Sequence, residues 1–368
     1  MSEGRLGAGS GGSGVGTGLL AADLDHILQH TQGIWEPLRG QRIFITGGTG
    51  FFGLWLLESF VRANAELELG ATACVLTRNP AVFAKKAPHL AQDAAIRLHA
   101  GDFTSFPFPE GSFHSVIHAA TEPEFAPHAE APLGIFDANV NGTRRVLEFA
   151  RQSGATRFLL TSSGAAYGRQ PSELTHIPEE YAGAPDTMDA NSAYGQSKRA
   201  CEFMVAMYAR QYGFAAPVAR CFAFAGPHLP LDLNFAIGNF VRDALAGGPI
   251  RIGGDGTARR SYLYAADLAI WLWTMLLQGE SCRLYNVGSD VDLSIAELAE
   301  KVAAVVAPEV GVRIGRAPVA GSPVARYVPS VARAGSELGL KVWISLDEGI
   351  GRMGKWYHPS VLRPKHLR

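Results

Sequence analysis

A run of glycines joins an apolar strand-like segment to an apolar helix-like segment, and this junction constrains the chain more than any other feature. Residues 42–46 are β-prone and apolar, and Gly47, Gly50 and Gly53 follow them. An apolar helical pattern begins at Phe51. Strand, glycine turn and helix form the first βα unit of a dinucleotide-binding fold, in which the helix N-terminus offers free N–H groups to a pyrophosphate. Gly47 and Gly50 can adopt positive φ and let a pyrophosphate approach the backbone, and Gly53 allows close packing of helix on strand.

The spacing of these glycines is G-x-x-G-x-x-G rather than the G-x-G-x-x-G of the standard fingerprint. No Lys-Ser or Lys-Thr pair follows, which excludes a P-loop. Because a glycine triplet also occurs in βα turns that bind nothing, the rest of the chain has to decide between a cofactor site and a simple tight turn.

Size and charge exclude several classes of protein. The 368 residues suffice for one large or two ordinary domains, and a net charge of −1 does not indicate nucleic acid or a membrane surface as the main partner. The longest apolar run, 262–277, contains Asp267 and is too short to span a bilayer, so it predicts a buried helix. Residues 1–18 are rich in Gly and Ser and lack the pattern of a signal peptide, which predicts a flexible tail.

The four cysteines are scattered without C-x-x-C spacing, each in an apolar run: Cys74, Cys201, Cys221 and Cys282. This pattern predicts reduced core thiols and a cytoplasmic protein. Neither H-E-x-x-H nor a Cys/His cluster occurs, so no metal site is predicted.

Strand-like and helix-like segments alternate from residue 42 onward, after a helical extension at 19–39. The strand-like runs are 42–46, 72–77, 96–99, 115–118, 157–161, 216–221 and 283–287. The helical patterns are 51–64, 134–152, 193–212 and 266–278. This alternation predicts an α/β fold with a Rossmann-type, doubly wound parallel sheet that binds its ligands at the carboxyl ends of the strands.

Gly- and Pro-rich segments interrupt the alternation after residue 222 and again after 288. We therefore expect a dinucleotide-binding domain at 40–225 plus 262–287. A smaller, discontinuous C-terminal substrate domain is expected at 226–261 plus 288–368.

The end of the second strand-like run bears on the choice between NAD and NADP. In an NAD-binding unit an acidic residue there binds the ribose 2′-hydroxyl, whereas an arginine accommodates the 2′-phosphate of NADP. No acid lies between Gly70 and Pro80, and Arg78 follows the run directly. This favours NADP(H); a solvated Arg78, or one that stacks on adenine, leaves NAD(H) possible.

Two further strand ends carry small or polar residues. Asp102 follows the third run, where its carboxylate suits the adenine amine. Ala119 and Ala120 follow the fourth, where small side chains let a cofactor lie flat against the backbone. We expect these ends to meet on one rim of the sheet.

Ser162 and Ser163 end the fifth run, and Tyr194 and Lys198 open the helix at 193–212. Tyr and Lys at i and i+4 share a helical face. Tyrosine titrates near pH ~10 and is a poor base at neutral pH, but a nearby ammonium and a positive nicotinamide ring stabilise the phenolate. With a serine to orient the substrate oxygen, this set can move a proton off an alcohol while hydride leaves for the cofactor.

Taken in this order, the motifs resemble the extended short-chain dehydrogenase/reductases of the sugar-nucleotide epimerase/dehydratase type, over about residues 40–358. The segments that carry the resemblance are the glycine turn, 101–102, 118–120, 139–143, 161–168, the Tyr194/Lys198 pair, 220–227, 254–256, 260–262, Asp267 and 285–288.

The resemblance implies roles for individual residues. Ser163, Tyr194 and Lys198 would be the catalytic trio, with Asn139 supporting the lysine and its water. Arg260 would grip the nucleotide diphosphate, since a guanidinium fork suits a pyrophosphate, although an ion pair with an acid is the structural alternative. The cofactor contacts would be Gly47, Thr49, Gly50, Phe51, Phe52, Gly53, Arg78, Asp102, Phe103, Ala119, Ala120, Asn139 and Lys198. The substrate contacts would be Thr121, Ser162, Ser163, Tyr194, Asn239 and Arg260, with Asn234 and Arg326 also plausible.

Departures from the family pattern narrow the chemistry. The 4,6-dehydratases carry an Asp-Glu pair just after the catalytic hydroxyl residue, and the decarboxylating members use a Glu in that segment, where this chain has Gly164 and Ala165. Dehydration and decarboxylation are therefore disfavoured. Ala223 replaces a family asparagine, which puts one usual substrate contact in doubt.

The remaining chemistry is hydride and proton exchange at one ring carbon. Reduction of a 4-keto nucleotide sugar by NADPH is our first interpretation. A 4-epimerase with tightly held NAD is the alternative, and a cofactor-binding regulator without turnover is a third. The resemblance also implies a homodimer joined through helices 134–152 and 193–212.

Overall fold

Seven parallel strands form the large sheet at the centre of the computed structural model, which describes residues 14–122, 132–233, 235–319 and 321–358. The order is β11-β6-β5-β4-β1-β2-β3, and all neighbouring pairs are parallel. The strands are β1 (Arg42–Thr46), β2 (Thr72–Thr77), β3 (Ile96–Ala100), β4 (Ser115–His118), β5 (Arg157–Ser163), β6 (Val218–Cys221) and β11 (Leu284–Val287). The strand order reverses between β1 and β4, which is where a doubly wound sheet opens its ligand crevice. The predicted fold class is confirmed.

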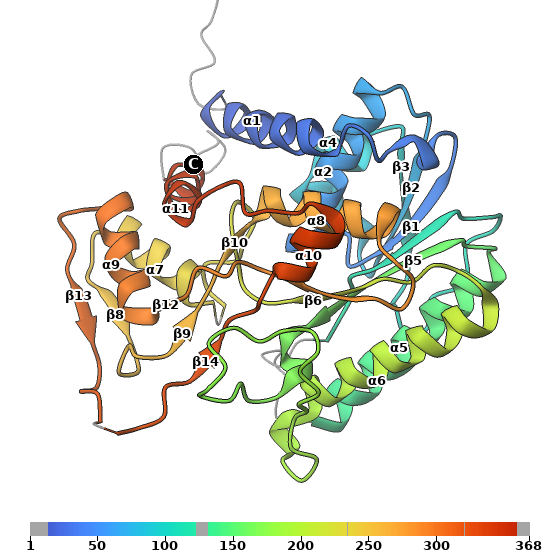
Figure 1. Ribbon diagram of the computed structural model, residues 1–368. Helices are drawn as coiled ribbons and strands as arrows, with labels where there is room; N and C mark the ends of the chain where they lie inside the picture. Colours follow the sequence, from blue (N-terminus) through green and yellow to red (C-terminus); the bar gives the residue numbers. More distant parts are fainter. Residues whose placement is uncertain (1–13, 123–131, 234, 320, 359–368) are drawn as a thin grey trace, which may run out of the picture.

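Helices cover both faces of this sheet (Figure 1). One face carries α5 (Pro132–Gln152) and α6 (Ala193–Tyr212), whose apolar side chains share a core cluster with β1, β4 and β5. The other carries α2 (Phe51–Glu66) and α8 (Ala265–Gln278), with α3 (Pro80–Lys86) and α4 (Pro88–Gln92) beside β2 and β3. Helix α8 is buried on all sides, as the run 262–277 predicted, because further helices cover its outer surface.

The N-terminal extension is one of these covering helices. Helix α1 (Gly14–Thr31) begins inside the stretch that we expected to be a flexible tail, and residues 1–13 lie outside the described part. It packs on α8, α2 and α11 (Leu346–Tyr357), and the Trp35 ring lies 4.7 Å from that of Trp273. The extension is therefore part of the main core.

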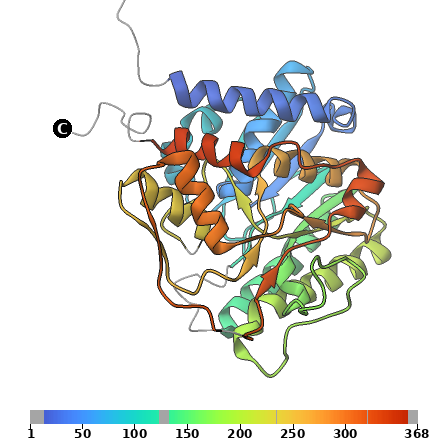
Figure 2. The same cartoon turned by 60° about the vertical axis from the view of Figure 1, so that its left-hand side comes forward.

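The second half of the molecule has short strands and a separate hydrophobic core, whose members include Leu229, Phe240, Leu298 and Ile350. Its elements are α7 (Ala236–Leu245), β8 (Ile250–Ile252), β9 (Arg259–Arg260), β12 (Leu293–Ser294), α9 (Ile295–Val306), β13 (Val312–Ile314), β14 (Arg326–Tyr327) and α11. They form the sheets β12-β9-β14 and β13-β8, while β7 (Phe224–Ala225) and β10 (Leu263–Tyr264) pair at the junction. Figure 2 shows this half beside the carboxyl end of the large sheet.

One segment of the expected second domain packs in the core of the first half. Helix α10 (Ala332–Leu338) and the chain up to Ile344 return to the core of the large sheet, where Ala334 and Leu340 are buried. The expected second domain thus contributes about a dozen residues to the first core. We retain the division as a proposal with this correction.

Three of the four cysteines are buried, as predicted, but Cys282 is exposed at a turn with a φ of 59°. Within the described ranges, no helix has the length and apolar character needed to cross a membrane.

Candidate active site

The glycine turn after β1 is tight at two of its three predicted positions. Gly47 has a φ of 72°, and a Cβ there would lie 2.5 Å from the Ala119 carbonyl. A Cβ on Gly53 would lie 2.3 Å from the Gly48 backbone. Gly50 does not use its freedom to adopt positive φ: its φ is −85°, and a Cβ there would meet only the Gly47 oxygen, at 3.4 Å. Gly47 and Gly53 are therefore required by packing, whereas Gly50 leaves open space.

The N-terminus of α2 faces that open space without a side-chain cap, because Gly50 is its N-cap residue. The first N–H groups of an uncapped helix are free to bind an anion, and the helix dipole favours negative charge there. Phe51, Phe52 and Gly53 form this first turn. Next to it, the Lys86 ammonium donates to the Thr49 carbonyl, at 3.0 Å. The turn therefore fits a dinucleotide pyrophosphate.

Neighbouring strand ends lie along the same rim. Arg78 follows β2, is exposed, and has no ion pair with any residue that the structure describes. The Asp102 carboxylate accepts from the backbone N–H of Thr104, at 2.9 Å, and from its hydroxyl, at 2.6 Å.

Two close contacts complete this rim. The Phe103 ring covers Gly142 of α5, where a Cβ would lie 2.2 Å from the ring. The Ala120 N–H donates to the Thr46 hydroxyl at 3.1 Å, next to the Ala119–Gly47 approach.

A buried histidine links this rim to α5. The His118 ring lies 2.7 Å from the Thr46 hydroxyl through Nδ1 and 3.0 Å from the Thr143 hydroxyl through Nε2. Since the Thr143 hydroxyl donates to Cys201 Sγ, the histidine must donate through Nε2 and accept through Nδ1. Burial, reinforced by the Lys198 ammonium, lowers the pKa of His118 to about 3. The imidazole is therefore neutral and structural at physiological pH.

The predicted trio comes from β5 and α6. Lys198 is buried, donates to the Thr161 carbonyl at 3.1 Å, and its ammonium lies 5.6 Å from the centre of the Tyr194 ring. Ser163 ends β5, and its hydroxyl accepts from the Ala165 N–H at 3.1 Å. The structure thus places the lysine beside the tyrosine on one face of α6.

Asn139 fixes the start of α6 from the facing helix. Its amide oxygen accepts from the Thr121 hydroxyl, at 3.0 Å, and its amide nitrogen donates to the Ser197 hydroxyl, at 3.1 Å. The Ser197 hydroxyl in turn donates to the Tyr194 carbonyl, at 2.8 Å. Asn139 and Thr121 are therefore linked by hydrogen bonds to the backbone of Tyr194.

Tyr327 is a site residue that the sequence did not indicate. It comes from β14 in the second half, and its hydroxyl lies 3.4 Å from the Ser163 hydroxyl. Its ring lies 4.6 Å from that of Phe222, and burial raises the pKa of its phenol. A Cβ on Gly164 would lie 2.7 Å from the Tyr327 hydroxyl, so the glycine and the tyrosine are sterically coupled. A lone tyrosine in a segment without periodicity offers no sequence signal for this contact.

Arg260 lies beside Tyr327 on the same side of the small sheet. Its guanidinium is 5.8 Å from the centre of the Tyr327 ring and donates to the Arg259 carbonyl, at 2.8 Å. No carboxylate in the described part of the chain pairs with it. Asp267 instead accepts from the N–H groups of 343–344 and lies against His26, and Asp255 accepts from Thr257. The ion pair considered as the structural alternative for Arg260 is not formed.

The side chains of two predicted substrate residues form hydrogen bonds with other parts of the protein. The Ser162 hydroxyl donates to the buried Glu202 carboxylate, which pairs with Arg220 at 2.5 Å. The Asn239 amide oxygen accepts from the Arg242 guanidinium on the same helix, at 3.1 Å. Ser162 therefore supports the core and does not face Tyr194, and Asn239 is not brought to this group. Asn234 lies outside the described residues.

The comparisons with known proteins agree with this fold. The family model described as the NAD dependent epimerase/dehydratase family matches residues 43–288. UDP-glucuronic acid decarboxylase 6 of Arabidopsis thaliana is 29% identical over 88% of this chain and 91% of its own length. Decarboxylase 1 of Xenopus tropicalis is 26% identical over 87% of this chain and 73% of its own length.

Solved structures share the fold at lower identity. The UDP-glucose 4-epimerase of Thermotoga maritima, solved with UDP-glucose, has a TM-score of 0.71 at 21% identity, covering 86% of this chain and 98% of its own. A dTDP-glucose 4,6-dehydratase of Streptomyces venezuelae, solved with NAD, has the same TM-score at 24% identity, covering 86% and 97%. The chain belongs to the NAD dependent epimerase/dehydratase family, as its motifs implied.

Proposed function

We propose that this protein is an enzyme that binds a nicotinamide dinucleotide and reduces a 4-keto nucleotide sugar. The observation that carries the proposal is the position of Arg260 beside Tyr327, whose hydroxyl lies 3.4 Å from that of Ser163. Among the described residues, no carboxylate pairs with the Arg260 guanidinium. A diphosphate held by Arg260 would leave its sugar beside the trio. The related Thermotoga epimerase was solved with a nucleotide sugar, which supports this substrate class.

Cofactor binding and proton transfer fall to different residues of the chain. The uncapped N-terminus of α2 and Lys198 would hold the cofactor, which supplies hydride when bound. Ser163 would orient the carbonyl oxygen, and the Tyr194 hydroxyl would give that oxygen a proton. The Lys198 ammonium, 5.6 Å from the ring, stabilises the phenolate until water returns the proton.

The Arabidopsis and Xenopus relatives support a second candidate, decarboxylation of UDP-glucuronic acid. This chain has Gly164 and Ala165 where decarboxylating members use a carboxylate, so we rank that reaction below reduction. A 4-epimerase needs no such carboxylate and stays an alternative that holds NAD tightly.

The first experiment identifies the nicotinamide cofactor released from the purified, denatured protein, with its stoichiometry. We expect an empty protein that binds NADPH more tightly than NADH and reduces a 4-keto nucleotide sugar. Near-stoichiometric retained NAD would favour the epimerase, and release of CO2 from UDP-glucuronic acid would establish the decarboxylase. Absence of binding by either cofactor would overturn the catalytic interpretation.

Tyr194→Phe tests the assignment of the acid. Loss of a general acid typically costs about 10²- to 10⁴-fold in rate, and we expect cofactor affinity to stay unchanged. Tyr208→Phe is the matched control, because Tyr208 lies on the same helix and its hydroxyl donates to Glu148. Unchanged biological activity of Tyr194→Phe would support a regulator in place of an enzyme.

We also propose a homodimer through α5 and α6. Leu133 and Phe203 on these helices are 78% and 66% exposed, and Met207, one turn after Phe203, is 42% exposed. Exposed apolar side chains along a helix pair favour a partner surface. Phe203→Glu is expected to give a monomer in light scattering, whereas Met188→Glu, on a loop elsewhere, is expected to leave the dimer intact.

A further inference from the structure

The sheet β12-β9-β14 carries different groups on its two faces. Adjacent residues of a strand point to opposite faces, and the parallel pairing of β14 with β9 sets Arg326 beside Arg259 and Tyr327 beside Arg260. Arg260 and Tyr327 share the face that looks toward Ser163. The two preceding arginines therefore share the outer face.

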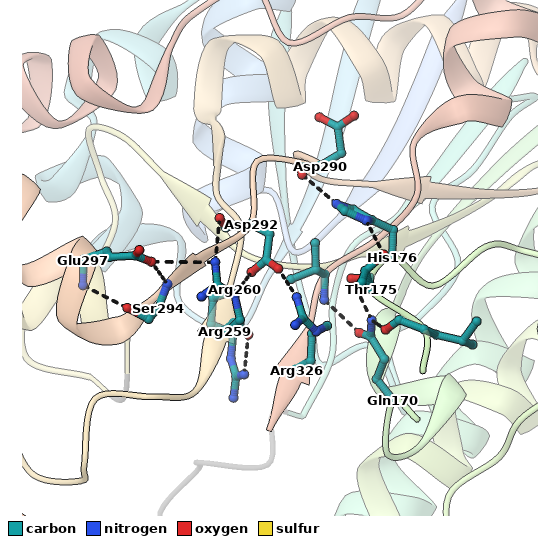
Figure 3. Close-up of polar contacts among 12 residues, drawn as sticks. Gln170, Thr175, His176, Arg259, Arg260, Asp290, Asp292, Ser294, Glu297 and Arg326 are labelled. Atoms are coloured by element: carbon teal, nitrogen blue, oxygen red, sulfur yellow. Dashed lines mark hydrogen bonds and ion pairs between the residues drawn. The ribbon is translucent and has the colours of Figure 1, made fainter. Parts of the chain in front are cut away.

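One carboxylate joins the two outer arginines. Asp292 lies just before β12, and its Oδ1 accepts from Arg259 Nε at 2.7 Å, while its Oδ2 accepts from Arg326 Nη1 (Figure 3). The Asp292 carbonyl also accepts from Arg259, at 3.2 Å. We call Arg259, Asp292 and Arg326 the outer cluster. Its three members come from three separate segments of the chain and hold the three strands together.

The outer cluster has the properties of a structural clamp, and its three members line a cavity of about 790 Å³. The side chains of Asp292 and Arg326 are each 16% exposed and that of Arg259 is 29% exposed, so the charges are partly shielded from water. Burial, with the repulsion of Arg259, lowers the pKa of the Arg326 guanidinium. Asp292 lies between the two cations, and Arg259 Nη2 also lies 3.7 Å from the Glu297 carboxylate. The neighbouring N-terminus of α9 is closed by the Ser294–Glu297 capping box and offers no anion site.

We propose that Asp292 is a positioning residue for substrate binding, acting through β9 and β14 on Arg260 and Tyr327. This inference rests on the proposed function, because it assigns Arg260 to the nucleotide diphosphate. Each of these strands is two residues long, so backbone hydrogen bonds alone fix them weakly, and a one-residue slip would exchange the two faces. The outer cluster therefore holds β9 and β14 in the register that directs Arg260 and Tyr327 toward Ser163.

The test measures the binding of UDP, dTDP and GDP to the full chain by calorimetry, so that it does not depend on turnover. We expect Asp292→Asn to lower the affinity for whichever of these three nucleotides binds by roughly tenfold, and to leave the affinity for the cofactor unchanged. Arg326→Met, which leaves the Arg259–Asp292 pair in place, should act in the same direction. Asp347→Asn is the matched control, because Asp347 forms an exposed ion pair with Lys301 in the same half.

A double-mutant cycle separates positioning from a general loss of stability. In an Arg260→Ala background, Asp292→Asn should change diphosphate affinity by less than about twofold, since the group it positions is gone. Equal losses with and without Arg260 would overturn the positioning role. Full binding by Asp292→Asn would also overturn it and leave the diphosphate site intact. Absence of binding of all three nucleotides by the unmodified protein would overturn both.

Discussion

The two halves of the molecule hold their candidate ligand groups in different ways. In the large-sheet half, the groups lie within a few residues of regular strand ends or on the long helices α5 and α6, and close backbone contacts fix the strand ends, as at Gly47 and Gly53. In the second half, Arg260 and Tyr327 come from two-residue strands far apart in the chain. Ion pairs such as those of Asp292 fix them. An added methyl group should therefore damage the large-sheet half, and the removal of a charged side chain should damage the second half.

The largest effect is expected where a charge joins the two halves. Asp23 on α1 is fully buried, accepts from the Tyr264 hydroxyl at 2.7 Å, and pairs with Arg352 of α11. Asp23→Ala removes the fully buried partner of Arg352, which keeps only the exposed Glu348, and leaves the buried Tyr264 phenol without its acceptor. The free energy of unfolding should fall by about 3–5 kcal/mol. Urea unfolding of the variant and the unmodified protein measures this loss.

Asp25→Ala is the control for this prediction, because Asp25 lies on the same helix and forms an ion pair with Arg62 while 60% exposed. Exposed pairs of this kind contribute about 0–1 kcal/mol. Equal losses in the two variants would mean that α1 stabilises the protein by its helical packing alone.

A methyl group should damage the glycine turn next. Gly53→Ala puts a Cβ 2.3 Å from the Gly48 backbone, and forced overpacking of this kind costs about 1–3 kcal/mol. The same change at Gly50, where the nearest atom would be 3.4 Å away, should cost less than about 1 kcal/mol. Thermal unfolding of the cofactor-free variants makes the comparison. Equal sensitivity at both glycines would show that the turn is uniformly packed.

The same difference explains how much the sequence could predict. The regular sheet follows from patterns of five or six residues, and β1 and β2 begin and end where the apolar runs do. Strands of two residues, such as β9 and β14, carry no periodicity, so neither their pairing nor the face of Tyr327 follows from local residues. The sequence predicts a helix within 19–39, but neither its start at Gly14 nor its burial, because its partners α8 and α11 lie hundreds of residues away.

The candidate site divides in the same way. Tyr194, Lys198 and Ser163 belong to motifs whose spacing the sequence displays, and the structure brings Lys198 to Tyr194. Ser162 could not be distinguished from Ser163 by spacing; its hydroxyl is taken by Glu202, which depends on the pairing of β5 with β6. A neighbouring residue on a strand faces the opposite way, and only the sheet decides which one faces the site.

Acid should weaken the large-sheet half through one buried imidazole. The pKa of His118 is lowered to about 3, against about 6.5 in the unfolded chain. The stability it contributes is complete above pH ~6.5 and falls by about 1.4 kcal/mol per pH unit below that value, because only the unfolded state takes up the proton. Burial also lowers the pKa of His228, to about 4, and raises that of Asp23, so the total slope combines several groups.

His118→Gln isolates this contribution, since an amide keeps a donor and an acceptor for Thr143 and Thr46 but does not titrate. Between pH 5.5 and pH 4, urea unfolding should show a slope that is smaller by about 1.4 kcal/mol per pH unit in the variant. Parallel slopes would show that another group controls the acid response of this half.

The smallest effect concerns the rim of the large sheet, where a side chain rather than the backbone is expected to choose the cofactor. Arg78 is exposed after β2, so an ion pair with a 2′-phosphate would be screened by solvent and contribute about 1 kcal/mol, or roughly fivefold in affinity. Arg78→Ala should weaken NADPH by that factor and leave NADH almost unchanged in fluorescence titrations at low salt. Lys85→Ala, which removes the same charge from an exposed position on α3, should affect neither cofactor. Equal weakening of NADPH and NADH by Arg78→Ala would refute the phosphate contact and return the choice of cofactor to the backbone-defined part of the site.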